Sequence, residues 1–279
     1  MRKDTLATRC ASVGPTVAAM VLSTCASAQL ATTSPSAGRV DRSAGPVAVL
    51  SAGPAWVFPA SDPSVTEPLV WAPATPVAIS PERVFVVSQP ADPEPSRLIA
   101  IDRATGQLDW WASIPDAVLD SWSSPTLDAN NDAVLMASGS PGGGGGEVRA
   151  FDAATGQLLW TAWLERDVVI STVVVTDDLG PADRAVIVEY EGFYQGGVGA
   201  AVVCINVDAF DAQSNPYEPG EIVWRYDLLD GASGATPAYA DGVMYVGTTG
   251  DAFFGIGGKV VALDVRVTHS MAAERWATT

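Results

Sequence analysis

The sequence predicts an all-β fold, a β-propeller of about four four-stranded blades, and three observations lead to this prediction. The segment 100–110 recurs almost unchanged at 150–160, and such a period is typical of stacked all-β units. Tryptophans that end copies of this segment recur every 50 to 64 residues, at positions 56, 110, 160, 224 and 276. The intervals between them contain short β-branched runs separated by Gly, Pro and Asp, which is typical of antiparallel strands.

The repeated segment reads as a strand, a tight turn and a second strand. The carboxylate of Asp102 ends the first strand and is expected to accept hydrogen bonds from backbone N–H groups two or three residues later. Gly106 supplies the positive φ that closes the turn. Trp110 then lies on the next strand, where its indole is expected to point into the gap between neighbouring sheets. The second copy has the same residues as Asp152, Gly156 and Trp160.

Less regular copies extend the array in both directions. Asp211 is followed, after a longer turn containing prolines, by Trp224, and Asp264 is followed by Trp276. Trp56 is typical of the closing strand of a preceding unit. The residues predicted to dock one blade on the next are therefore Asp102, Gly106, Trp110, Asp152, Gly156, Trp160, Trp224 and Trp276.

The strands of each blade follow from these runs. We expect them at 75–79, 83–88 and 98–101; at 124–127, 133–138 and 147–151; at 171–175, 184–190 and 200–205; and at 235–239, 243–247 and 259–263. A tryptophan strand completes each blade.

The domain organisation predicted from this spacing has seven parts. Residues 1–28 are a signal peptide, 29–45 a flexible leader rich in Ser, Ala, Thr and Gly, and 46–70 a partial blade. The four blades span 71–116, 117–167, 168–230 and 231–279. A small closed ring, an open or partial array, and a ring completed by a second copy of the chain all remain compatible with four units.

The pattern Ala-x-Asp-x-x-Thr-Gly-x-x-x-Trp, with Ser/Thr-Pro at the head of the innermost strand, resembles the tryptophan-docking repeat of the PQQ-like β-propeller superfamily. The resemblance covers roughly Trp71 to Trp276. That superfamily includes quinoprotein dehydrogenases, the outer-membrane assembly lipoprotein BamB and many secreted repeat proteins. It implies either a noncatalytic scaffold that binds a protein or a small ligand, or a degenerate or partial PQQ-dependent dehydrogenase.

The resemblance does not carry over at the catalytic positions. Quinoprotein dehydrogenases place a vicinal cysteine pair against the quinone and bind calcium with Glu, Asn and Asp, but this chain has no Cys-Cys pair. Four blades are also about half the usual ring. His269 is the sole histidine, so a Ser-His-Asp or Cys-His arrangement is not expected. We therefore predict a protein that is not an enzyme, with no catalytic residues and with neither PQQ nor calcium as a cofactor.

One acidic turn is a weak candidate for a metal site. Asp128, Asn130 and Asp132 have the alternate oxygen spacing of a calcium loop, but glycine and glutamate are missing from its sixth and twelfth positions. An ordinary hairpin turn is favoured, because Asp177-Asp178 and Asp183 occupy the same turn of the next blade.

Aromatic residues on glycine-rich loops are the candidates for partner binding. They lie in the second hairpin of the third and fourth blades, on the face where propellers usually meet ligands: Phe193, Tyr194, Phe253 and Phe254. The alternative is that these side chains fold back and cover sheet edges.

The N-terminal sequence and the charge predict an exported protein, secreted or periplasmic. A basic start, an apolar stretch over 11–22 and Ala26-Ser-Ala28 form a signal-peptide pattern, too short for a membrane span. Leu22 to Cys25 resembles a lipobox, but Thr24 departs from it, so a lipid anchor at Cys25 is the second choice. The formal charge of −17 excludes a nucleic-acid partner. Cys204 lies alone in a strand and is expected to be a buried, inert thiol.

Overall fold

A computed structural model describes most of the repeat region. The described residues are 20–22, 53–65, 69–71, 76–89, 96–114, 123–139, 145–168, 171–179, 183–190, 199–228, 236–248, 257–266 and 273–278. The predicted leader, Cys25 and His269 lie outside them, and only Met20–Leu22 of the predicted signal peptide lies within.

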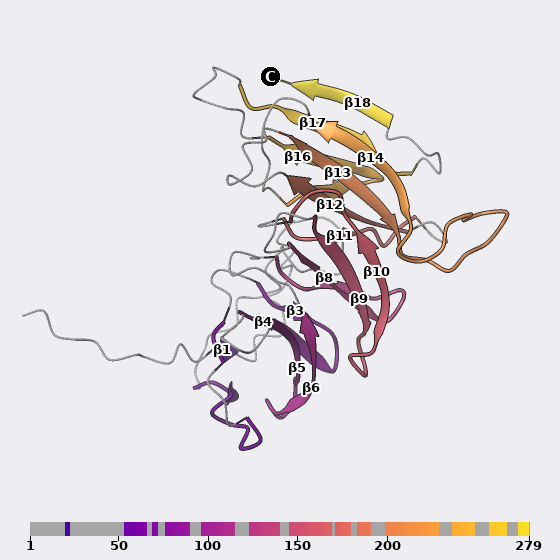
Figure 1. Ribbon diagram of the computed structural model, residues 1–279. Helices are drawn as coiled ribbons and strands as arrows, with labels where there is room; N and C mark the ends of the chain where they lie inside the picture. Colours follow the sequence, from indigo (N-terminus) through magenta and orange to yellow (C-terminus); the bar gives the residue numbers. More distant parts are fainter. Residues whose placement is uncertain are drawn as a thin grey trace, which may run out of the picture.

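The fold consists of four antiparallel four-stranded sheets, which confirms the predicted class (Figure 1). The first sheet contains β3 (Ala78–Ile79), β4 (Arg83–Ser88), β5 (Ser96–Asp102) and β6 (Leu108–Ile114). The second contains β7 (Thr126–Asp128), β8 (Ala133–Ser138), β9 (Glu147–Asp152) and β10 (Leu158–Trp163). The third contains β11 (Val174–Val175), β12 (Arg184–Tyr190), β13 (Ala200–Asn206) and β14 (Ile222–Leu228). The fourth contains β15 (Ala238–Ala240), β16 (Val243–Gly247), β17 (Val260–Asp264) and β18 (Ala273–Thr278).

Each sheet is a meander in which every strand pairs with the next one along the chain. The sheets fan out side by side from the first to the fourth, and they form an open array (Figure 1). The shortest strands, β3, β7, β11 and β15, form the inner edge, and β6, β10, β14 and β18 form the outer edge. The described residues form no helix, and so contain none that is long and apolar enough to cross a membrane.

The strands of the middle sheets are largely apolar because both faces of these sheets are buried. Every residue of β13 is buried, because one face packs on the second sheet and the other on the fourth. Separate apolar cores therefore lie between the first and second, second and third, and third and fourth sheets. Cys204 lies in the last of these cores, and burial raises the pKa of its thiol to about 12. The thiol is therefore protonated and unreactive in the folded protein.

A segment before the first sheet covers the outer face of that sheet. It contains β2 (Trp56–Phe58), which pairs with β1 (Met20–Leu22) in a separate two-stranded sheet. Phe58 is buried against Val84, Val86 and Ile99 of the first sheet. Trp71 forms a β-bridge with Ser88, so the segment also meets the edge of β4.

Hydroxyl groups join the inner edges of successive sheets. The backbone N–H of Ser124 donates to Thr172 Oγ1 at 3.0 Å, and the N–H of Thr172 donates to Thr236 Oγ1 at 3.0 Å. Ser123 Oγ and Thr126 Oγ1 donate to backbone carbonyls of the third sheet, both at 2.7 Å. This inner ladder satisfies buried donors that the short inner strands leave unpaired.

Candidate functional site

The two intact turns have matching hydrogen bonds. Asp102 Oδ1 accepts from the N–H of Thr105 at 2.7 Å, from its hydroxyl at 2.7 Å, and from the N–H of Ala104 at 3.1 Å. Asp152 Oδ1 accepts the corresponding three bonds from the N–H of Thr155 at 2.7 Å, from its hydroxyl at 2.7 Å, and from the N–H of Ala154 at 3.0 Å. Hydrogen bonds from the threonine lower the pKa of both carboxyl groups. The carboxyl groups of both aspartates are therefore ionised at neutral pH.

The tryptophans connect each sheet to the next. Trp110 of β6 packs over Gly156 in the turn of the second sheet, and its Nε1 donates to the carbonyl of Ala153 at 3.2 Å. Trp56 donates to the carbonyl of Arg103 at 3.0 Å in the same way. Further along the chain, Trp160 packs over Gly220. In each of these three contacts, the tryptophan packs on the turn of the sheet that follows it along the chain.

The last two tryptophans are placed differently. Trp224 is 3% exposed in the core between the third and fourth sheets, and its Nε1 has no hydrogen-bond acceptor among the described residues. Trp276 lies on β18, but its side chain is outside the described part.

The enlarged turn of the third sheet keeps its aspartate and its glycine. Asp211 Oδ1 accepts from the N–H groups of Gln213 and Ser214 at 2.8 and 2.9 Å. These backbone hydrogen bonds lower the pKa of Asp211, so it stays ionised. Gly220 has a φ of +86°, as a left-handed turn residue requires.

A buried arginine, which was not predicted from the sequence, fixes this turn. Arg184 is 1% exposed; its Nη1 donates to Asn206 Oδ1 at 2.7 Å and its Nη2 to Asn215 Oδ1 at 3.3 Å. The guanidinium also lies 5.9 Å from the ring centre of Tyr217. Its signal in the sequence was an arginine directly before the apolar run 185–188.

The acidic turn weighed as a metal site forms a hydrogen-bond network between the second and third sheets. Asn131 Nδ2 donates to Asp128 Oδ2 at 2.9 Å and to Asp208 Oδ1 at 3.0 Å. Asn130 Nδ2 donates to Asp183 Oδ2 at 2.8 Å, whereas Asp132 is exposed. Burial raises the pKa of the Asp128 carboxyl, and the charges of Asp208 and Asp183 add to this effect.

The acidic side chains of the described ranges do not come together as a metal centre. No group of three or more His, Cys, Asp or Glu side chains is placed there to hold an ion. In the next turn, Asp178 accepts a hydrogen bond from the Tyr239 hydroxyl, and Asp177 is exposed.

A second charged cluster joins the same two sheets at their opposite end. Glu189 is fully buried and forms an ion pair with Arg225, and its Oε2 accepts from the N–H of Arg166 at 3.0 Å. Arg225 also pairs with Glu165 at 3.0 Å, and Arg166 with Asp227 at 3.2 Å. Burial raises the pKa of Glu189. The charged side chains of this cluster are therefore paired with one another and link the second and third sheets.

The loop aromatics predicted to bind a partner lie outside the described residues. This applies to Phe193 and Tyr194 in the third blade and to Phe253 and Phe254 in the fourth. Their role stays a prediction.

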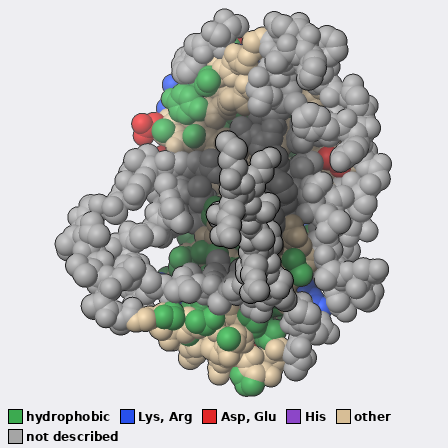
Figure 2. Space-filling view, turned by 90° about the vertical axis from the view of Figure 1, so that its left-hand side faces the viewer, with side chains coloured by type: hydrophobic (Ala, Val, Ile, Leu, Met, Phe, Trp, Pro, Cys, Tyr) green, Lys and Arg blue, Asp and Glu red, His purple; other side chains and the backbone are tan. Residues whose placement is uncertain are grey.

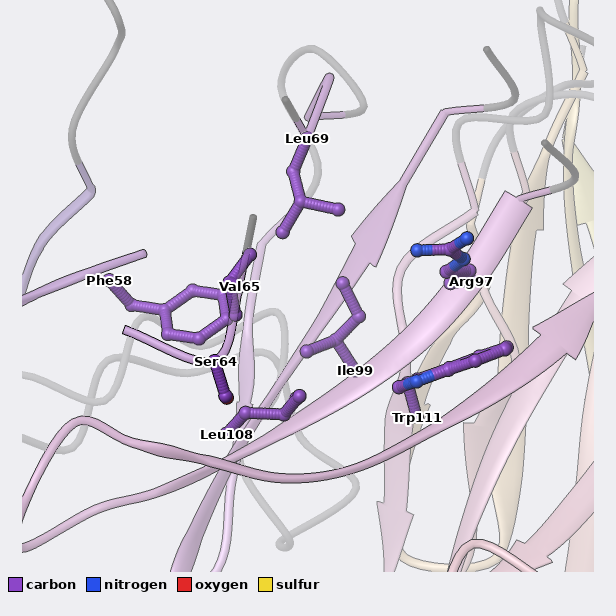
Figure 3. A pocket seen from close by; sticks show the side chains of 8 residues that line it. All are labelled: Phe58, Ser64, Val65, Leu69, Arg97, Ile99, Leu108 and Trp111. Carbon is purple, nitrogen blue, oxygen red and sulfur yellow. The ribbon is translucent and has the colours of Figure 1, made fainter. Parts of the chain in front are cut away.

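A small pocket lies on the outer face of the first sheet. It has a volume of about 250 Å³ and lies between the segment before β3 and strands β5 and β6 (Figure 3). Apolar side chains line one side, whereas Arg97 and Trp111 form the other, with the guanidinium 4.5 Å from the ring centre (Figure 3). The lining residues are Phe58, Ser64, Val65, Leu69, Arg97, Ile99, Leu108 and Trp111. Figure 2 shows hydrophobic side chains along the lower end of the molecule and a further group at its upper left.

Five of the eight large apolar side chains that are exposed among the described residues lie on the outer strands of the second and third sheets or in the loop between β13 and β14. We call this group the rim patch, and its members, with their exposed fractions, are Leu158 (49%), Leu159 (49%), Trp163 (71%), Phe210 (50%) and Ile222 (37%). Three of them lie on β10, one in the loop that projects from the third sheet, and one at the start of β14 (Figure 1). The contact between Trp160 and Gly220 holds strand and loop together.

Comparison with protein families finds one matching model. It is described as outer membrane protein assembly factor BamB, and it matches residues 53–191 and, in an overlapping second copy, 144–267. Comparison with curated protein sequences gave no match.

Solved structures share the fold at low sequence identity. The quinohemoprotein alcohol dehydrogenase of Comamonas testosteroni is 15% identical, with a TM-score of 0.52 over 76% of this chain and 35% of its own. A europium-containing methanol dehydrogenase is 14% identical (TM-score 0.42; 73% of this chain, 41% of its own). The Dos1 propeller is 11% identical (TM-score 0.44; 73% of this chain, 47% of its own). The chain thus spans less than half of each of these structures, and the first similarity shows the propeller fold.

Proposed function

From the premise that this chain belongs to the repeat family described as outer membrane protein assembly factor BamB, we propose that it is an exported, noncatalytic propeller that serves as a binding scaffold for another protein. The rim patch is the observation that carries this proposal. Exposed apolar side chains gathered on one surface are typical of sites that bind other proteins.

The use of the buried charges supports a scaffold rather than a catalyst. Glu189, Asp183 and Arg184 each make hydrogen bonds or ion pairs that hold sheets or turns together. Catalytic acids and bases, by contrast, stand where a substrate can reach them. These three buried charged side chains therefore have a role in holding the architecture together.

The binding role is tested by capture from extracts of the cell envelope. The chain without residues 1–28 is immobilised, and captured proteins are identified by mass spectrometry. Trp163→Ser and Phe210→Ser should abolish capture of a specific protein without lowering the melting temperature, because both side chains are at least half exposed. Val260→Ser is the matched control, since Val260 is 40% exposed on the fourth sheet. Capture that is unchanged by Trp163→Ser and Phe210→Ser contradicts the proposal.

The noncatalytic part of the proposal is tested against the quinoprotein alternative. After correction for the absorbance of free PQQ, addition of PQQ and calcium should leave the absorbance and the tryptophan fluorescence of the protein unchanged and produce no dye-linked oxidation of alcohols. A saturable spectral change accompanied by dye reduction would overturn it.

Export is tested by fractionation and by the mass of the mature chain. We propose cleavage after Ala28, which gives a chain that begins at Gln29 and is found outside the cytoplasm. A mature chain that begins at a lipidated Cys25 supports the anchor instead.

A further inference from the structure

The geometry of the rim points to the chemistry of its partner. We propose that β10 binds an extended, cationic segment of another polypeptide as an additional strand, with the acidic loop 207–221 holding the basic side chains of that segment. This inference rests on the proposed function, which it deepens by naming the occupant of the rim patch.

β10 is an open edge. It is the terminal strand of the second sheet and pairs only with β9. An edge strand presents unpaired backbone N–H and C=O groups, and a peptide in extended conformation can satisfy them. Leu159 and Trp163 are exposed beside this edge, so apolar side chains of the added strand have surface to pack on.

β10 also lacks the protection that the other outer strands have. β6 carries Asp109, β14 carries Arg225 and Asp227, and β18 carries Glu274 and Arg275. Charged side chains on edge strands oppose pairing with another chain. The sequence of β10, Leu-Leu-Trp-Thr-Ala-Trp, contains no charged residue at all. Among the four outer strands, only this one is uncharged.

The charge of the surroundings selects a cationic partner. The loop that packs beside β10 through Gly220 carries Asp208, Asp211, Glu218 and Glu221, and positions 207–224 contain no Lys or Arg. Asp211, Glu218 and Glu221 are exposed. Basic side chains of an added strand would be attracted to this loop, and the formal charge of −17 on the whole chain acts in the same direction.

The same charges argue against a second copy of the chain as the occupant. Pairing of β10 with β10 of another copy would bring two acidic 207–221 loops towards one another. Like charges placed together across an interface oppose association.

The test uses the chain without residues 1–28 and synthetic peptides. The probe is a fluorescent peptide in which valine and lysine alternate. One control peptide carries N-methyl groups on alternate backbone nitrogens, which removes strand hydrogen bonds, and another has glutamate in place of lysine. Leu159→Lys with Trp163→Lys should weaken binding of the valine–lysine peptide at least about tenfold, because it places repelling charges on the edge. Val260→Lys should leave the affinity unchanged.

Each outcome decides the matter. Binding of the valine–lysine peptide alone, weakened by Glu218→Gln with Glu221→Gln, supports the proposal. Equal binding of the N-methylated peptide, equal binding of the glutamate peptide, or no binding overturns it. A chain that sediments as a dimer and becomes a monomer on Trp163→Lys assigns β10 to a second copy and also overturns it. If capture from envelope extracts still depends on Trp163 and Phe210, the binding function stands while this inference fails.

Discussion

At the scale of single residues, Gly156 shows how one position fixes the junction between two sheets. Its φ is +73°, and a Cβ added there would lie 2.5 Å from the Trp110 ring. Gly156→Ala should therefore lower the free energy of unfolding by about 2 to 4 kcal/mol, from backbone strain and displacement of the indole. Urea denaturation measures this change. Gly247→Ala is the control, because no atom lies within 4 Å of its Cβ position, and an equal loss in both variants would contradict the explanation.

The contributions of two aspartates to the free energy of unfolding should change with pH in opposite directions. Folding raises the pKa of Asp128 above its ordinary value of 3.8, so ionisation of this group costs stability as the pH rises through the raised pKa. Folding lowers the pKa of Asp102, which therefore stabilises the fold above pH 3.8, and this stability is lost as the pH falls through the lowered pKa. Relative to wild type, Asp128→Asn should thus gain stability from acid to neutral pH, and Asp102→Asn should lose it. Unfolding curves measured across this range check both signs, and parallel profiles would contradict the assignment.

The sequence pattern singles out residues that act locally. Asp102 and Gly106 could be assigned because their partners lie within a few positions along the chain. Arg184 was missed because its partners, Asn206 and Asn215, lie 22 and 31 residues away. Asn131 was missed for the same reason, since it reaches Asp208 across 77 residues. Single positions in a repeat do not reveal which polar groups meet between sheets.

At the scale of elements, the inner ladder shows that short strands depend on side-chain hydroxyls. β11 has only two residues, and Thr172, just before it, accepts from the N–H of Ser124. Thr172→Val keeps the shape but leaves this buried donor unsatisfied, which should cost about 1 to 3 kcal/mol.

The control for this prediction is Thr172→Ser, which keeps the hydroxyl. Hydrogen exchange at the Ser124 amide distinguishes the two variants. Exchange should become faster in Thr172→Val and stay slow in Thr172→Ser. Equal exchange in both would mean that the hydroxyl is not the acceptor that matters.

The elements themselves followed from the sequence, but the length of the inner strands did not. Runs such as 171–175 were expected to be strands, yet only Val174–Val175 is paired, because Ser171 and Thr172 bond to neighbouring sheets instead. The exposure of β10 was not predicted either. Only the structure shows that Trp163 on this strand is left uncovered.

At the scale of the whole molecule, the excess of acidic side chains should make stability depend on salt. With 32 acidic and 15 basic residues, the chain repels itself, and a compact state brings these charges together. Adding sodium chloride to a dilute buffer should raise the melting temperature by several degrees, because salt screens this repulsion. Differential scanning calorimetry measures it, and sucrose at equal osmolality controls for changes in water activity. A melting temperature that falls with salt would show that the ion pairs between sheets outweigh the repulsion.

The one-way contact of an indole with the following glycine turn has a consequence for how such a chain changes over generations. The junctions made by Trp56, Trp110 and Trp160 use the same pair of parts, so a unit duplicated in frame at one of them meets a glycine on one side and offers an indole on the other. Gain or loss of a whole unit at such a junction therefore keeps the contact between indole and glycine. The 207–221 loop shows the complementary freedom, because its insertion left both Asp211 and Gly220 in place and lengthened only what projects between them.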